Sequence, residues 1–186
     1  MLRHMRLVTL VLLCVAGAVL SIAVMPAVTA SAASIDDQVH ATLQKLYAAV
    51  PVAKTIGEKA RAVLVFPNIV KAGLIIGGQY GDGALVKGGR IVGHYNSVAA
   101  SYGLQAGAQT FGYALFLMND KAIEHLDNSE GWEIGVGPSI VIVDEGKAKT
   151  MTSTTLRDDV YAFVFSQKGL MAGLGIQGSK ITKLSK

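Results

Sequence analysis

The stretch Ile91–Met118, IVGHYNSVAASYGLQAGAQTFGYALFLM, decides how this chain folds, because it contains no Asp, Glu, Lys or Arg. A run of this length without charge is buried in protein or lies against lipid. Polar side chains and glycines make it a poor membrane-spanning helix. These residues are His94, Asn96, Gln105 and Gln109, and Gly93, Gly103, Gly107 and Gly112. We therefore predict that the stretch forms strands.

Two patterns inside this stretch support strands. From Gly103 to Gln109, polar residues or glycines alternate with apolar ones, which is the period of a strand. From Tyr113 to Met118 the run is continuously apolar, as in a central strand. We predict a bend or bulge at Phe111–Gly112 between the two parts.

Short strands and glycine turns precede the central stretch. The strands that we expect are Ala62–Phe66, Leu74–Tyr80, Ala84–Lys87 and Arg90–Asn96. The residues that we expect to end them are Pro67-Asn68, Gly81-Asp82-Gly83 and Gly88-Gly89. These segments read as hairpins in series.

Downstream, we predict a short helix at Asn119–Leu126 and a strand at Trp132–Val143, which a turn at Asp144–Lys147 ends. Ile134, Val136, Ile140 and Ile142 would share one face of that strand. A last pair of strands, Val160–Gln167 and Leu170–Gln177, would turn at Lys168-Gly169.

Two helices are expected before the strands. Ser34 is a plausible N-cap, and one apolar stripe follows it: Ile35, Val39, Leu43, Leu46 and Val50. Pro51 ends or kinks this helix, and Val52–Arg61 reads as a second, shorter one. The predicted class is α+β, with N-terminal helices packed on a curved, barrel-like antiparallel β-sheet.

The N-terminus has the layout of a secretory signal peptide. Basic residues precede the apolar run Leu7–Ile22, and the small residues Ala30-Ser31-Ala32 follow. We predict residues 1–32 as a signal peptide and residues 33–186 as a single domain, exported to the periplasm or cell envelope. A retained membrane anchor is one alternative. Lipoprotein processing at Cys14 is another, which Leu13 disfavours because a small residue is needed there.

No motif in the chain points to catalysis. Removal of residues 1–32 removes Cys14, the only cysteine, and His40, His94 and His125 lack metal-ligand spacing. The string Gly173–Gly178 matches G-x-G-x-x-G but lies too close to the C-terminus for a dinucleotide site. We therefore predict no enzyme activity, no cofactor and no metal.

Charge and glycine each leave two explanations open. Basic residues dominate Val39–Arg90, which suits either a solvated surface or a face for an anionic partner. They are Lys45, Lys54, Lys59, Arg61, Lys71, Lys87 and Arg90, against Glu58 and Asp82. Glycines inside predicted strands suit either tight curvature or close approach of a ligand, such as an acyl chain, to the backbone.

An ordered series of motifs runs from about Val52 to the C-terminus. It comprises Arg61–Asn68 (RAVLVFPN), Lys71-Ala72-Gly73, Gly77–Gly83 (GGQYGDG), Tyr102–Gln109 (YGLQAGAQ), Gly131-Trp132-Glu133, Phe165–Gly173 (FSQKGLMAG) and Gly178-Ser179-Lys180. This series resembles the SYLF domain family. The resemblance implies lipid binding without catalytic residues. Eukaryotic members bind phosphoinositides, with a basic amphipathic N-terminal segment implicated, and a yeast branch binds and bundles actin.

We therefore expect a lipid-binding protein of the bacterial cell envelope that docks on anionic phospholipids or a membrane surface. The headgroup candidates are Lys54, Lys59, Arg61 and Lys71. Arg61 and Lys71 lie in the family motifs, whereas Lys54 and Lys59 are chosen on charge alone. The alternative is a structural or protein-interaction scaffold of the envelope, similar to the actin-binding branch. We expect no nucleic-acid partner, and the sequence identifies no protein partner.

Overall fold

The computed structural model describes residues 33–74, 76–102, 107–128, 131–143, 151, 156–169, 176 and 178–185. Its helices are α2 (Ile35–Ala49), α3 (Pro51–Lys59) and α4 (Asp120–Asn128). Its strands are β1 (Ala62–Gly73), β2 (Ile76–Lys87), β3 (Arg90–Tyr102), β4 (Gly107–Leu117), β5 (Trp132–Glu133), β6 (Ile140–Val143), β7 (Val160–Gly169) and β8 (Lys180–Lys183). All of them belong to one compact unit, Ala33–Lys186. The predicted signal peptide lies outside the described residues.

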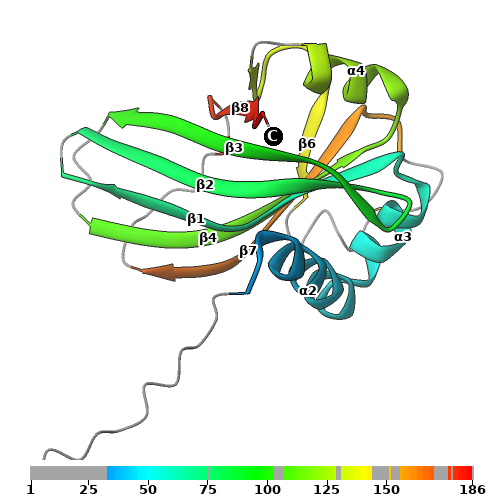
Figure 1. Cartoon of the computed structure of the whole chain (residues 1–186), viewed down its shortest axis with the longest axis horizontal. Helices are drawn as coiled ribbons and strands as arrows, with labels where there is room; N and C mark the ends of the chain where they lie inside the picture. The colour runs from blue at the N-terminus through cyan, green and yellow to red at the C-terminus, as the bar shows by residue number, and fades with distance from the viewer. Residues whose placement is uncertain are drawn as a thin grey trace, which may run out of the picture. The chain divides into compact units, whose positions relative to one another are not determined.

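The strands of the described residues form one curled sheet of eight strands, in the order β5-β8-β3-β2-β1-β4-β7-β6 (Figure 1). The long strands β1 to β4 pair antiparallel with one another, as the predicted hairpins require. β6 pairs in parallel with β7, so the sheet is mixed rather than purely antiparallel. The predicted α+β class, with N-terminal helices on a curved, barrel-like sheet, is confirmed.

Helices α2 and α3 form where the sequence predicts them. The Ser34 hydroxyl caps α2 by accepting a hydrogen bond of 3.2 Å from the amide of Asp37. Pro51 begins α3, where its missing N–H costs nothing, and so it separates the two helices. The buried residues of α2 are Val39, Leu43 and Leu46. No helix in the described part of the chain is long and apolar enough to cross a membrane.

The sheet is covered on both faces at the end where β1 begins. On the face that we call the helix face, Val63 and Phe116 pack in one cluster with residues of α2 and α3. On the opposite face, which we call the inner face, Leu64 packs in a second cluster with Ala162 of β7 and Ile181 of β8. β7 and β8 lie near opposite edges of the sheet, so the sheet curls around this inner cluster.

Pro67-Asn68 does not end β1, contrary to the prediction. The strand continues through it, and its register with β4 shifts between Phe66 and Ile69. β1 lies between β2 and β4, and proline has no N–H to donate to a neighbour, so an interior strand tolerates it at a bulge.

The bulge predicted at Phe111–Gly112 is confirmed. The register of β4 with β7 shifts between Thr110 and Gly112. A Cβ atom on Gly112 would lie 2.8 Å from the carbonyl oxygen of Pro67, so the bulges of β1 and β4 lie side by side.

The turn predicted at Gly81-Asp82-Gly83 is wrong, because β2 is continuous through these residues. Glycine is needed there because β1 approaches the backbone of β2 closely. A Cβ atom on Gly81 would lie 2.5 Å from the carbonyl oxygen of Asn68, and one on Gly83 would lie 2.6 Å from the Phe66 ring. The turn predicted at Gly88-Gly89 is confirmed, with φ angles of +57° and +76° that suit glycine.

The single strand predicted at Trp132–Val143 is also wrong. The segment divides into β5 and β6, which pair with β8 and β7 respectively. Gly135 and Gly137 have φ angles of +106° and +94°, which turn the chain between them. Ile134 is therefore buried whereas Val136 is 58% exposed.

The remaining predicted elements have mixed outcomes. The helix predicted at Asn119–Leu126 is confirmed as α4, and the strand predicted at Val160–Gln167 as β7. The turn at Asp144–Lys147 lies outside the described residues, as does Leu170–Gln177 apart from Ile176. β8, which we did not predict, pairs with β3 and β5.

Asp159 ties three segments together at the end of the sheet where β7 begins. Its carboxylate accepts hydrogen bonds from the Asn119 side-chain amide (2.7 Å) and from the Ser139 backbone amide (2.9 Å) and hydroxyl (3.2 Å). The hydrogen bond from Asn119, together with those from Ser139, lowers the pKa of Asp159. The carboxylate therefore holds the start of α4 and the segment before β6 against β7.

We expect Asp159→Ala to lower the free energy of unfolding by about 0.5–1.5 kcal/mol at pH 7, because it removes hydrogen bonds to a charged acceptor that solvent partly screens. The stability that a lowered carboxyl pKa contributes is present above the pKa of the unfolded chain, about 3.9. It is lost as the pH falls through the lower pKa of the folded state. The difference between the two proteins should therefore shrink below pH 4.

Urea denaturation at pH 7 and at pH 3 measures this difference. Glu124→Ala removes an exposed carboxylate of α4 and serves as the control, with little expected change at either pH. An Asp159→Ala effect of the same size at both pH values would contradict the prediction.

Candidate functional site

The four predicted headgroup residues do not lie together. Lys54 and Lys59 are exposed on α3, and Arg61 is exposed just before β1. Lys71 lies ten residues further along the chain, roughly 30 Å away at the rise of a strand. It is only 9% exposed and shares the inner face with Ile69. The structure thus separates Lys71 from the other three.

A group of exposed cations lies at the end of the sheet where β1 begins. Val63 is opposite Val86 in the β1–β2 register, so the β2–β3 turn lies beside the start of β1. We call this group the basic end. It comprises Lys54, Lys59, Arg61, Lys87 and Arg90, all exposed.

At the opposite end of the sheet, exposed apolar side chains gather on the helix face. Cross-strand pairing places Val98, Tyr80, Val70 and Thr110 in one line across β3, β2, β1 and β4. The same line continues to a lysine at each end. We call it the outer row: Lys180, Val98, Tyr80, Val70, Thr110 and Lys168.

The outer row lies beyond the cover of the helices. Val70, Tyr80 and Val98 are about half exposed, at 47%, 50% and 44%. Val70 and Tyr80 line a hollow of about 360 Å³ beside Ile35 of α2. Further out, at the β1–β2 connection, Leu74 is 73% exposed and Ile76 is 62% exposed. In Figure 1 this end of β1 and β2 points away from α2 and α3.

One residue further along each strand, polar side chains lie on the inner face. Lys71 is opposite Gln79 of β2 and Gln109 of β4. Directly paired residues have Cβ atoms about 5 Å apart, so the three side chains are neighbours. Gln79 and Gln109 are each 5% exposed. We call these three residues the inner row.

Hydrogen bonds satisfy the polar groups on either side of the inner row. The Gln79 side-chain amide donates to the Ser179 hydroxyl at 2.7 Å. Nearer the core, the Tyr113 hydroxyl donates to the Ser97 hydroxyl at 2.7 Å, and burial raises the pKa of Tyr113. Tyr113 therefore stays neutral and keeps its proton for Ser97.

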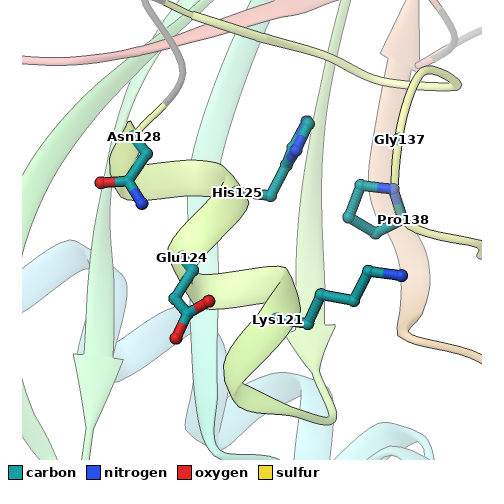
Figure 2. Close-up of a pocket in the computed structure, with 6 residues that line it drawn as sticks. All are labelled: Lys121, Glu124, His125, Asn128, Gly137 and Pro138. Atoms are coloured by element: carbon teal, nitrogen blue, oxygen red, sulfur yellow. The ribbon is translucent and has the colours of Figure 1, made fainter.

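A separate hollow of about 410 Å³ lies between α4 and the segment before β6 (Figure 2). Lys121 and His125 extend from α4 toward Pro138, whereas Glu124 and Asn128 extend from the other side of the helix. The His125 ring packs edge-on against Trp132, with ring centroids 5.9 Å apart. Within the described residues, no group of His, Cys, Asp and Glu could hold a metal ion.

Sequence reasoning identified Lys71 but missed its neighbours. The alternation from Gly103 to Gln109 was the available signal for Gln109, because it placed that glutamine on one face of a strand. The outer row was missed because the turn predicted at Gly81–Gly83 divided β2 and left no continuous strand on which to place Tyr80.

Comparison with known proteins bears on residues 98–186. A family model described as Ysc84: Las17-binding protein actin regulator matches this part of the chain, which is just under half of it and runs from the middle of β3 to the C-terminus. No curated protein matches the chain. The match confirms, over residues 98–186, the resemblance of this chain to the SYLF (Ysc84) family, a family of lipid- or actin-binding domains.

Proposed function

We propose that this chain is a non-enzymatic, lipid-binding protein of the bacterial cell envelope that docks on anionic phospholipid. The family match supports lipid as one of two ligand classes. The outer row carries the proposal. Three half-exposed apolar side chains lie there between Lys168 and Lys180, on the part of the helix face that α2 and α3 do not bury.

This arrangement suits the surface of an anionic membrane. Apolar side chains at the interface bury surface that water otherwise contacts, and each nearby lysine contributes about 1 kcal/mol of attraction. Leu74 and Ile76 are the most exposed large apolar residues of the described chain and lie at the same end. They would enter the boundary between headgroups and acyl chains while the lysines contact phosphates. The basic end would add long-range attraction.

Export to the envelope is part of the proposal. It rests on the layout of residues 1–32, in which Arg3 and Arg6 precede an apolar run and Ala30-Ser31-Ala32 follow it. The intact mass of the mature protein tests this part, since a species that retains residues 1–32 would contradict it.

The description of the matched family favours a second candidate function, a protein-interaction scaffold of the actin-binding kind. In that case the outer row would contact a protein surface. Vesicle binding separates the two functions, because a scaffold has no reason to prefer anionic over neutral lipid.

We expect vesicles that contain phosphatidylglycerol to recruit the mature protein more strongly than phosphatidylcholine vesicles, and salt to weaken recruitment. Replacing Lys168 and Lys180 together by Gln should lower the partition coefficient about 30-fold, from about 1 kcal/mol per lysine. Lys54→Gln with Arg61→Gln removes the same charge at the basic end and should cost less. Sedimentation with vesicles measures all three proteins.

The two charge variants also define the results that count against this surface. Equal losses would mean that net charge, rather than the outer row, governs recruitment. No loss from either pair, with recruitment that is insensitive to salt, would exclude headgroup attraction.

We further expect Leu74→Ser with Ile76→Ser to weaken recruitment severalfold without lowering stability, because both side chains are already exposed. Val136→Ser with Leu184→Ser is the matched control, since these apolar residues are exposed elsewhere, at 58% and 39%. Vesicle sedimentation and thermal unfolding measure the two effects. A control pair that weakens recruitment as much would contradict an insertion role for the β1–β2 connection.

A further inference from the structure

We infer that the inner row binds, through Lys71 and Gln109, the headgroup of a single phospholipid that carries a phosphate and a free hydroxyl, as in phosphatidylglycerol. This inference rests on the proposed lipid-binding function and assigns it a second site on the opposite face of the sheet from the outer row.

The charge of Lys71 points to an anion. The side chain is nine-tenths buried, and no carboxylate of the described residues lies within ion-pair distance of it. The Lys71 Nζ atom is not one of the buried polar atoms that lack a partner, so the methylene stem is buried while the ammonium group reaches the surface of the inner face. A cation held there without a carboxylate beside it is available to an anionic ligand.

Gln109 adds a second requirement. Its side-chain carbonyl oxygen, Oε1, is buried and has no hydrogen-bond partner in the described residues. The other such atom, Oδ1 of Asn96, belongs to the opposite face, because Asn96 lies between Tyr95 and Ser97, which face inward. The Gln109 carbonyl oxygen lacks a hydrogen-bond donor, and the Lys71 ammonium group beside it lacks an anion. A ligand that carries an anionic oxygen and a hydroxyl group would satisfy both.

The neighbouring polar groups do not compete for that ligand. The Gln79 amide is held by Ser179, and the hydroxyl of Tyr113 is held by Ser97. On the inner face, the described polar groups that still lack a partner are therefore those of Lys71 and Gln109. Gln79 and Tyr113 fix the walls of the site on either side.

The next inner-face line outward from the inner row consists of Gly77, Gly73 and Gly107, which pair across β2, β1 and β4. Among the described residues, a Cβ atom on Gly107 would meet nothing within 4 Å, whereas one on Gly73 would clash with the backbone of Gly77. On the β4 side this line therefore places no side chain of its own in front of the inner row. Lys71 lies three residues before Leu74, about 10 Å from the β1–β2 connection. A headgroup on Lys71 could thus direct its acyl chains along the glycines toward that connection.

Short-chain lipids below their micelle concentration test the site without a membrane. We expect dihexanoyl phosphatidylglycerol to bind the mature protein in isothermal titration and to raise its melting temperature. Dihexanoyl phosphatidylmethanol, a phosphodiester of the same charge whose headgroup lacks a hydroxyl, should bind more weakly. Glycerol phosphate and inorganic phosphate should bind at least tenfold more weakly, because they lack acyl chains.

Lys71→Met is the decisive variant. It should leave the melting temperature of the ligand-free protein unchanged or higher and weaken binding of dihexanoyl phosphatidylglycerol at least tenfold. Lys45→Met, which replaces an exposed lysine of α2, should change neither quantity. Gln109→Met should reduce the preference for phosphatidylglycerol over phosphatidylmethanol.

Several results would overturn the inference. Lys71→Met could retain affinity within twofold, or could be destabilised or unfolded, which would make Lys71 a structural residue. Phosphate or glycerol phosphate binding as tightly as the lipid would show that the site takes a soluble anion. Unchanged selectivity in Gln109→Met would remove the hydroxyl contact.

Failure of this site and failure of membrane docking are distinguishable. If wild-type protein binds the soluble lipid but anionic vesicles do not recruit it, docking fails and the inner row stands. If Lys71→Met retains its affinity for soluble lipid while Lys168→Gln with Lys180→Gln abolishes vesicle recruitment, the inner row fails and docking stands.

Discussion

Burial of both faces of β1 and β4 is the constraint on which the rest of the structure depends. Side chains that alternate along β1, such as Val63 and Leu64, enter different clusters, one beneath α2 and α3 and one inside the curl. The continuously apolar part of β4 satisfies both clusters at once. This double cover extends over only part of each long strand. The other part is free to carry exposed apolar residues on one face and polar residues on the other, and both proposed lipid contacts lie there.

The outer row and the inner row differ in how much free energy their residues cost the folded protein. Val70, Tyr80 and Val98 expose apolar surface, which a monomeric protein tolerates in small amounts. The inner row is more expensive, because the buried carbonyl oxygen of Gln109 has no hydrogen-bond partner among the described residues, and the mostly buried side chain of Lys71 has no carboxylate beside it. The inner row is therefore the stronger evidence for a bound ligand. The outer row is the stronger evidence for docking on a membrane surface.

The sequence predicted the fold class and most elements, because their signals are local. Ser34, the apolar stripe of α2, Pro51 and the paired glycines at 88 and 89 each act within one or two turns of chain. The sequence-based predictions were wrong where the local structure depends on a residue far away in the sequence. Gly81 and Gly83 accommodate Phe66 and Asn68 of the neighbouring strand, and Pro67 is absorbed by a bulge, so neither signal means a turn. For the same reason we grouped Lys71 with Lys54, Lys59 and Arg61 as headgroup candidates, although only Arg61 and Lys71 lie in the family motifs. Only cross-strand pairing distinguishes Lys71, between two glutamines, from the exposed cations of the basic end.

The short strands at the two edges of the sheet have a consequence for solubility. β5 has two residues and β6 has four, whereas the strands with 11 to 13 residues, β1 to β4, all lie in the interior of the sheet. A long open edge invites strand addition from a second molecule, and such pairing is a common start of aggregation. Here the apolar side chains of Val70, Tyr80 and Val98 sit on strands whose backbone hydrogen bonds are already made. At the outer row the protein therefore presents apolar side chains on strands whose backbone is already paired, although among the described residues β8 pairs with β3 only at Tyr95–Val98 and β6 pairs with β7 only at Val160–Phe163.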